Sequence, residues 1–112
     1  MKIVDWYLLP DLGVSHNPEI KKRTLIGTNE IPQLMMYGTA IFKPGQEVKL
    51  HKHDTMYEVF LIQTGKAIFI ILGNEYEVSP GNCITIEPGE LHAQRNPFDT
   101  DVSWTYFGIA TD

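Results

Sequence analysis

The sequence has little of several features that would point to common protein classes. It contains one cysteine in 112 residues, so the chain cannot form an internal disulfide. Its 9 Lys and Arg are outnumbered by 14 Asp and Glu, and the formal net charge is −5. This charge argues against nucleic acid or an anionic membrane as the main partner. No apolar run approaches the ~18 residues of a membrane-spanning helix.

Targeting and catalytic signatures are also missing. The first residues place Asp5 inside a short apolar run and lack the shape of a signal peptide, so we expect a cytoplasmic protein. There is no phosphate-binding loop, nucleophile elbow or catalytic triad signature. No motif residue is placed to activate Cys83, which we expect to be a small buried side chain rather than a nucleophile.

What the sequence does contain is a regular series of turn signals between short apolar runs. Strands are expected at residues 24–27 and 34–42, and a final strand from about residue 102 to 109. The expected turns include a hairpin closed at residues 63–66, a two-residue hairpin turn at Gly73-Asn74, and type II turns at Pro80-Gly81 and Pro88-Gly89. Turns every ~8–12 residues indicate a single all-β domain, an antiparallel sandwich or barrel.

The first 33 residues are less regular. Residues 2–9 are expected to form a strand, and residues 10–18 a loop in which His16 is a surface residue. Asn17-Pro18 suits the start of a short helical turn, although an extended arm is equally consistent with it. The basic cluster Lys21-Lys22-Arg23 is expected to be a solvated face.

Four residues in the middle of the chain form a metal-binding pattern. His51 and His53 are two residues apart, so both side chains point to one face if they lie in a strand. Glu58 follows a short connection, and an antiparallel return there would bring it beside the histidines. Its strand face otherwise carries apolar side chains, where a lone carboxylate is costly unless a cation accompanies it. His92 begins a later strand-like stretch.

The spacing of these residues resembles the two motifs of the cupin family. Gly45, His51, His53, Glu58 and Gly65 follow the first motif, and the second is followed by Gly81, Gly89, His92 and Asn96. One position departs from the pattern, because Glu87 stands where a proline is expected and Pro88 follows it. The resemblance covers roughly residues 34–110.

The resemblance implies a double-stranded β-helix, or jelly-roll, barrel at residues 34–112. Residues 1–33 would form an arm that packs on this barrel or on a partner chain. It also implies one divalent metal ion held by His51, His53, Glu58 and His92, and such ligands suit iron, manganese, nickel, copper or zinc. It does not imply one reaction. We expect a metal-dependent dioxygenase, isomerase or lyase acting on a small anionic or polyhydroxylated substrate, and keep as the alternative a non-catalytic module that binds or senses a small molecule or sugar.

Strand phase indicates which other residues meet a substrate. Gln94 shares the face of His92, and Lys49 shares the face of the two earlier histidines, at the rim or in solvent. Asn96 is expected to have a structural role in the turn with Pro97. The aromatic candidates for the pocket wall are Tyr37, Trp104 and Tyr106, for which core packing is the simpler role.

A second copy of the chain is the expected protein partner. Val48 and Leu50 lie opposite the histidines in phase, and apolar residues also lie opposite Glu58. Both faces of these strands therefore need cover. Because cupins commonly dimerise in this way, we expect a homodimer with residues 1–9 in its interface.

Overall fold

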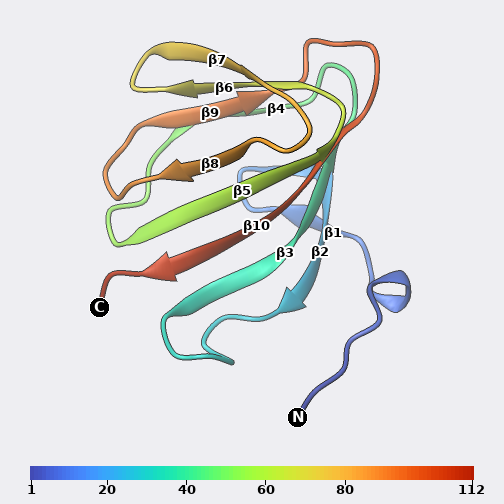
Figure 1. The fold of residues 1–112 in the computed structure, drawn as a ribbon, viewed down its shortest axis with the longest axis vertical. Coiled ribbons are helices and arrows are strands. Elements are labelled where there is room, and N and C mark those ends of the chain that lie inside the picture. The colour runs from blue at the N-terminus through green and yellow to red at the C-terminus, as the bar shows by residue number, and fades with distance from the viewer.

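The structure, a computed structural model, describes residues 1–112. It is built from strands, with one short 3-10 helix, η1 (Trp6–Leu8), before them (Figure 1). The strands are β1 (Leu12–Val14), β2 (Asn17–Ile26), β3 (Leu34–Phe42), β4 (Glu47–His51), β5 (Met56–Thr64), β6 (Ala67–Ile71), β7 (Asn74–Val78), β8 (Cys83–Ile86), β9 (His92–Arg95) and β10 (Val102–Ala110). None of the helical structure has the length and apolar character that crossing a bilayer requires.

The strands form two antiparallel sheets (Figure 1). The larger has the order β1-β2-β3-β10-β5-β8, and the smaller has the order β4-β9-β6-β7. The last strand, β10, lies between β3 and β5, so the C-terminal strand joins the first three strands to β5 and β8 within one sheet. This is the jelly-roll arrangement, and the predicted fold class is confirmed.

Alternation of apolar and polar side chains explains how the sheets bury a core. In β5, Phe60 and Ile62 are buried, whereas Leu61 between them is 43% exposed. In β10, the buried Trp104 packs against Phe42 with ring centroids 4.6 Å apart. The core therefore fills the space between the sheets, and its members are Ile20, Ala40, Phe42, Val48, Phe60, Ile62, Ala67, Phe69, Val78, Ile86, Val102 and Trp104.

The two Pro-Gly turns form as predicted. Gly81 and Gly89 have φ values of +92° and +82°, and each turn is closed by a hydrogen bond between its first and fourth residues, at 3.0 and 3.2 Å. The hairpin between β6 and β7 also forms, but one residue earlier than predicted. Its central residues are Leu72 and Gly73, both with positive φ, as in a type I′ turn.

The predicted hairpin at residues 63–66 is wrong. β5 and β6 belong to different sheets, so this turn carries the chain from one sheet to the other. Gly65 has φ +72° there, and a side chain at this position would overlap the carbonyl oxygen of Asp101. Glycine is therefore required by both backbone conformation and space.

The N-terminal region differs from the expectation in two ways. Residues 2–9 form no strand; Asp5 caps η1, and the Trp6 indole donates a hydrogen bond to Thr39 Oγ1 at 2.7 Å. Asn17-Pro18, where either a helical turn or an extended arm was expected, is extended and begins β2, which pairs with β3 and contains residues 24–26 of the strand expected at 24–27. The loop expected at residues 10–18 also contains β1. The larger sheet thus includes strands that precede residue 34.

Strand phase in β4 was also predicted wrongly. Val48 pairs with Gln94 and His51 with His92, so β4 has one residue more than β9 between these pairs. This bulge turns both Val48 and His51 inward and leaves Lys49 and Leu50 exposed. The prediction for Cys83 is likewise wrong, because its thiol is exposed.

Candidate metal centre

Three strands bring the four predicted ligands to one end of the barrel interior. His51 ends β4, His53 follows it, Glu58 lies in β5 and His92 begins β9. One ligand atom from each residue lies within 4.8 Å of those of the others. The structure therefore places together all four residues predicted from their spacing.

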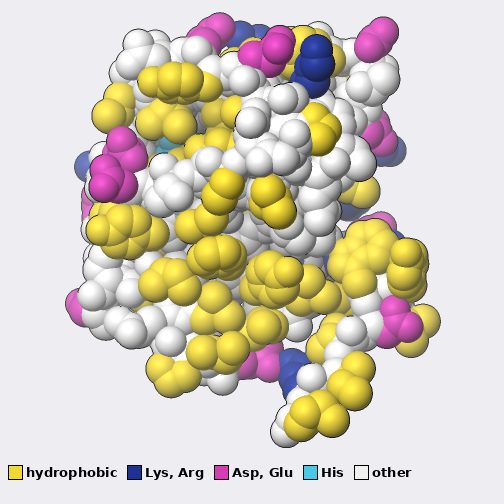
Figure 2. Space-filling view, viewed as in Figure 1, with side chains coloured by type: hydrophobic (Ala, Val, Ile, Leu, Met, Phe, Trp, Pro, Cys, Tyr) yellow, Lys and Arg dark blue, Asp and Glu magenta, His cyan; other side chains and the backbone are white.

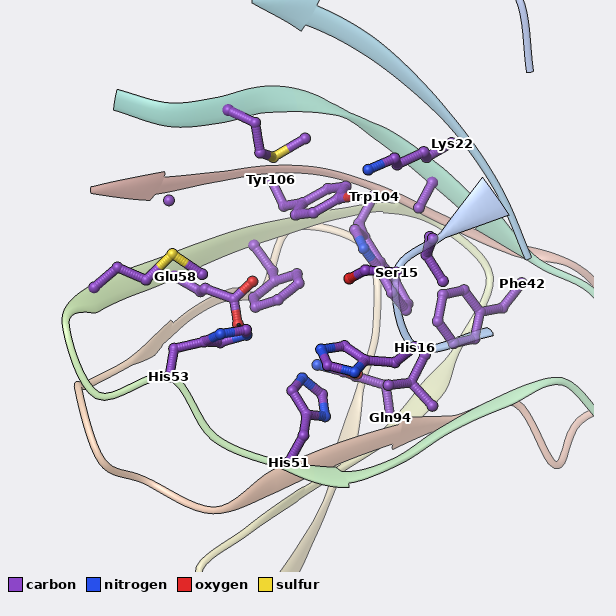
Figure 3. Close-up of a pocket in the computed structure, with 17 residues that line it drawn as sticks. Ser15, His16, Lys22, Phe42, His51, His53, Glu58, Gln94, Trp104 and Tyr106 are labelled. Atoms are coloured by element: carbon purple, nitrogen blue, oxygen red, sulfur yellow. Dashed lines mark ion pairs between the residues drawn. The ribbon is translucent and has the colours of Figure 1, made fainter. Parts of the chain in front are cut away.

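The route by which Glu58 reaches the histidines differs from the expectation. β4 and β5 do not form a hairpin; they lie in opposite sheets. His51 and His92 are direct neighbours across the β4–β9 pair. Glu58 pairs with Gly108 of β10 and extends into the interior from the other sheet (Figure 3). The cluster thus links the two sheets across the barrel.

Backbone hydrogen bonds orient two of the imidazoles. Nδ1 of His51 donates to the carbonyl oxygen of Lys49 at 2.8 Å, and Nδ1 of His92 donates to that of Glu90 at 2.8 Å. A carbonyl oxygen only accepts, so Nδ1 carries the proton in both rings. The Nε2 atoms are thereby left as the ligand atoms, the arrangement usual for metal-binding histidines.

Glu58 is the electrostatic centre of the cluster. Its Oε1 lies 3.3 Å from His53 Nε2 and 3.2 Å from His92 Nε2, and its side chain is only 12% exposed. Burial alone raises the pKa of Glu58, but hydrogen bonds from His53 and His92, which form when their Nε2 atoms carry protons, outweigh this effect and hold the pKa down at about 2. A metal ion bound at the same point would take the place of these Nε2 protons. The carboxylate is therefore ionised at neutral pH.

The pKa values of His51 and His53 are shifted in opposite directions. Burial lowers the pKa of His51 to about 4, helped by the neighbouring imidazoles and opposed by its hydrogen bond to the Lys49 carbonyl. The hydrogen bond with Glu58 raises the pKa of His53, against the effect of burial. At neutral pH the His51 ring is therefore neutral, with a lone pair free to bind a cation.

The donor set fits a divalent metal ion. Nitrogen and oxygen ligands at about 2.0–2.2 Å from one ion lie about 3.0–3.5 Å apart in octahedral or tetrahedral geometry. The separations of 3.2 and 3.3 Å between Glu58 and the two imidazoles fall in this range. Three imidazoles and one carboxylate also form a set that first-row transition metals accept. The cluster is able to hold such an ion.

The sequence matches the model of the cupin domain over residues 38–108, which is more than half of the chain. The protein belongs to the cupin family.

Two characterised cupin relatives share part of its sequence. The oxalate-binding protein of Thermotoga maritima is 31% identical over 61 residues, covering 54% of this chain and 50% of its own. Dimethylsulfoniopropionate lyase DddW of Ruegeria pomeroyi is 38% identical over 73 residues, covering 64% of this chain and 47% of its own. The chain thus spans about half the length of the curated relatives it matches.

Solved structures share the fold over nearly the whole chain. A protein described as a predicted oxalate decarboxylase from Thermotoga maritima has a TM-score of 0.89 at 20% identity, covering 97% of this chain and 99% of its own. The polyketide cyclase RemF from Streptomyces resistomycificus has a TM-score of 0.82 at 21% identity, covering 100% of this chain and 80% of its own. At such identities these likenesses concern the fold alone.

A cavity of about 150 Å³ adjoins the ligand cluster of this cupin (Figure 3). Its lining includes His51, His53 and Glu58 together with apolar side chains such as Phe60, which follows Glu58 on the inward face of β5. Pockets for drug-sized ligands usually measure about 300–1,000 Å³, so this cavity suits a small molecule.

The predicted pocket residues divide between this cavity and other places. Gln94, Trp104 and Tyr106 line the cavity, as phase suggested. Tyr37 does not; it alternates with the inward-facing residues of β3 and lines a different hollow with Val4 and Leu25. The bulge in β4 places Lys49 outside the barrel, and only its carbonyl oxygen contacts the cluster.

Two cavity residues were assigned to the surface from the sequence. His16 is exposed in the β1–β2 turn, but its ring centroid lies 4.1 Å from that of His51. Lys22 belongs to the basic cluster expected in solvent, yet it lines the cavity. Lys22 is two residues from the apolar Ile20, so in a strand both side chains point to the same inward face. This spacing is the sequence signal that could have identified Lys22 as a cavity residue. No sequence signal indicated the fold of the β1–β2 turn over the cavity.

Gln94 and Asn96, two residues apart in and after β9, have different surroundings. The Asn96 amide donates to the carbonyl oxygens of Phe42 and Thr100, at 3.0 and 2.8 Å, and its oxygen accepts from the Phe98 N–H. This supports the structural role predicted for Asn96. Gln94 is only 4% exposed, but its amide faces the cavity rather than a protein partner.

Replacement of these two amides should therefore affect stability differently. Asn96→Ala should lower the free energy of unfolding by about 2–3 kcal/mol, because it leaves buried backbone groups without partners. Gln94→Met should change it by less than about 1 kcal/mol, since it removes no hydrogen bond within the protein. Urea unfolding of the two variants and the parent protein measures both values. Equal losses would contradict the distinction.

Proposed function

We propose that this cupin binds one divalent metal ion through His51, His53, Glu58 and His92 and is a metal-dependent enzyme. Its substrate would be a small anionic or polyhydroxylated molecule, and its reaction that of a dioxygenase, isomerase or lyase. The observation that carries the proposal is the convergence of four ligand atoms within 4.8 Å beside a small cavity.

The charge of the site supports an anionic substrate. One carboxylate among three neutral imidazoles leaves about +1 on a divalent ion. Such an ion supplies Lewis-acid chemistry, and redox chemistry if it is iron, manganese or copper. The protein would contribute a partly open, largely apolar cavity in which electrostatic attraction is stronger than in water. Gln94 would orient the substrate by hydrogen bonding rather than by proton transfer, because an amide does not titrate.

The names of the relatives are consistent with this substrate class. One refers to oxalate and the other to a propionate, and both are carboxylates. One is described as a binding protein and the other as a lyase. The first name favours the alternative function, a non-catalytic module that binds or senses a small acid or sugar. Neither relative assigns the function of this chain, which matches about half of each.

The metal assignment predicts that single ligand replacements remove the ion. His53→Ala and His92→Ala should each retain less than about a tenth of the metal bound by the parent protein, because metal affinity depends on the full ligand set. The barrel should stay folded, since its core is separate from the cluster. His16→Ala is the matched control and should retain the metal. Elemental analysis of protein purified without chelators measures this, and equal metal in the parent and both ligand variants would refute the assignment.

The enzyme assignment predicts turnover with at least one metal. Metal-free protein would be reconstituted separately with iron, manganese, nickel, copper and zinc. Each form would be assayed for oxygen uptake and for conversion of keto acids, diketones, catechols, dicarboxylates and sugars. Turnover restricted to iron, with oxygen uptake, would indicate a dioxygenase, whereas turnover with zinc would indicate an isomerase or lyase because zinc has no redox chemistry. Tight binding without turnover under any metal would favour the binding module.

We also propose that the protein is a homodimer. Figure 2 shows hydrophobic side chains gathered over β3, β10 and β5 and along the N-terminal segment. On this outer sheet face, Tyr57, Leu61 and Ile109 are 37–43% exposed, and in the segment Ile3 and Tyr7 are 82–84% exposed. A contiguous apolar surface of this kind is typical of an interface. The N-terminal segment would then contribute to the contact.

Light scattering should give twice the monomer mass of 12.8 kDa at micromolar concentration. Leu61→Lys should shift the protein toward the monomer, because it places a charge at the centre of the apolar face. Leu50→Lys, a matched change at an exposed leucine of the other sheet, should not. A parent protein that is monomeric under these conditions would refute the dimer.

A further inference from the structure

The basic cluster of β2 is split between the two faces of the sheet. Lys21 is exposed, and Arg23 is held by Asp11 at 2.8 Å, with its guanidinium 4.2 Å from the centroid of the Trp6 ring. Lys22 alternates with them, shares its face with the buried Ile20 and lines the cavity beside the metal cluster. None of the ion pairs in the protein includes Lys22.

The neighbouring strand leaves room for Lys22 to extend across the interior. β3 presents Ala40 and Gly38 beside it, and on their far side these residues pair with Trp104 and Tyr106 of β10. Because alanine and glycine have almost no side chain, a long side chain from β2 can lie over β3. Figure 3 shows the Lys22 side chain directed into the pocket, toward the wall where Tyr106 lies.

Lys22 and the ligand cluster approach the cavity from different positions. Glu58 pairs with Gly108 of β10. Lys22 pairs with Ala40 of β3, which in turn pairs with Trp104 of β10, four residues from Gly108. This separation is about 13 Å along the strand at roughly 3.3 Å per residue. The cavity between them is lined by aromatic rings, including Phe60. Because the Lys22 side chain extends from its own strand toward Tyr106, a metal ion and the ammonium group would face one small, mostly apolar space from different strands.

An ammonium group in such a space lacks a counter-ion and is only partly hydrated. Its attraction for an anion is stronger there than in water, because the effective dielectric constant is lower. The carboxylate of Glu58 is already engaged by His53 and His92, so it does not neutralise Lys22. An anionic ligand can therefore supply the counter-charge that the Lys22 ammonium group lacks.

We propose that Lys22 is a specificity-determining residue that binds a second anionic group of the substrate. The substrate would be a small dianion, such as a dicarboxylate, with one end at the ligand cluster and the other at the Lys22 ammonium. This deepens, and rests on, the proposed metal-dependent function. It favours dianions over neutral sugars, catechols and diketones.

The test compares binding of dicarboxylates and monocarboxylates of matched chain length. The probes are malonate, succinate and glutarate against propionate, butyrate and valerate, titrated calorimetrically into the metal-loaded protein. The parent protein should prefer at least one dicarboxylate by about 10-fold or more, as expected for one charge-assisted hydrogen bond. Lys22→Met, which keeps an unbranched apolar stem, should lose this preference. Lys21→Met, the same change on the outer face, should keep it.

Two further measurements keep the outcomes distinct. Elemental analysis of every sample reports whether the metal is bound, and thermal unfolding reports whether each variant is folded. If Lys22→Met does not fold, Lys22→Gln takes its place in the comparison. A parent protein without metal would overturn the proposed function. Full metal content with no dicarboxylate preference in the parent protein, or with the same preference in the Lys22 variant, would overturn the role of Lys22 alone.

Discussion

The contact on which the site depends is that of one buried carboxylate with imidazoles from the opposite side of the barrel. Glu58 projects from the larger sheet, and His51 and His92 project from the smaller one. A carboxylate in this position would be costly if it were alone, because burial disfavours its charge. The imidazole nitrogens reverse that cost and keep the group ionised at neutral pH. The same arrangement concentrates unshared electron pairs at one point, which is the condition for binding a metal ion.

The rest of the barrel holds this contact in place. Trp104 of the larger sheet packs against Phe42 of the same sheet and against Phe69 of the smaller sheet, with ring centroids 4.6 and 5.3 Å apart. Asn96 joins the end of β9 to the end of β3 through the carbonyl of Phe42. Backbone carbonyls then fix the tautomers of two ligand histidines. The four ligands are not members of the core, although Phe42, Phe60 and Trp104 belong both to the core and to the cavity wall. The core therefore maintains the geometry, and the polar residues of the cavity are free to determine what binds.

This separation explains why the fold says little about the reaction. Solved proteins of similar fold carry descriptions as different as predicted oxalate decarboxylase and polyketide cyclase. A shared scaffold supplies the position of a metal, whereas the substrate is selected by the few side chains that line the cavity. Two polar members of that lining, His16 and Lys22, come from β2 and the turn before it, outside the residues that match the cupin model.

The sequence by itself determined the features that depend on local chemistry. Strand periodicity identified the inward face of β5, the Pro-Gly pairs identified two turns, and motif spacing identified the four clustered residues. Tertiary structure decided which strands share a sheet, so the turn at Gly65 crosses between sheets and Glu58 meets the histidines across the barrel. It also decided the bulge in β4 and the fold of the β1–β2 turn beside His51. These features depend on pairing between distant strands, and neither strand period nor turn composition carries information about such partners.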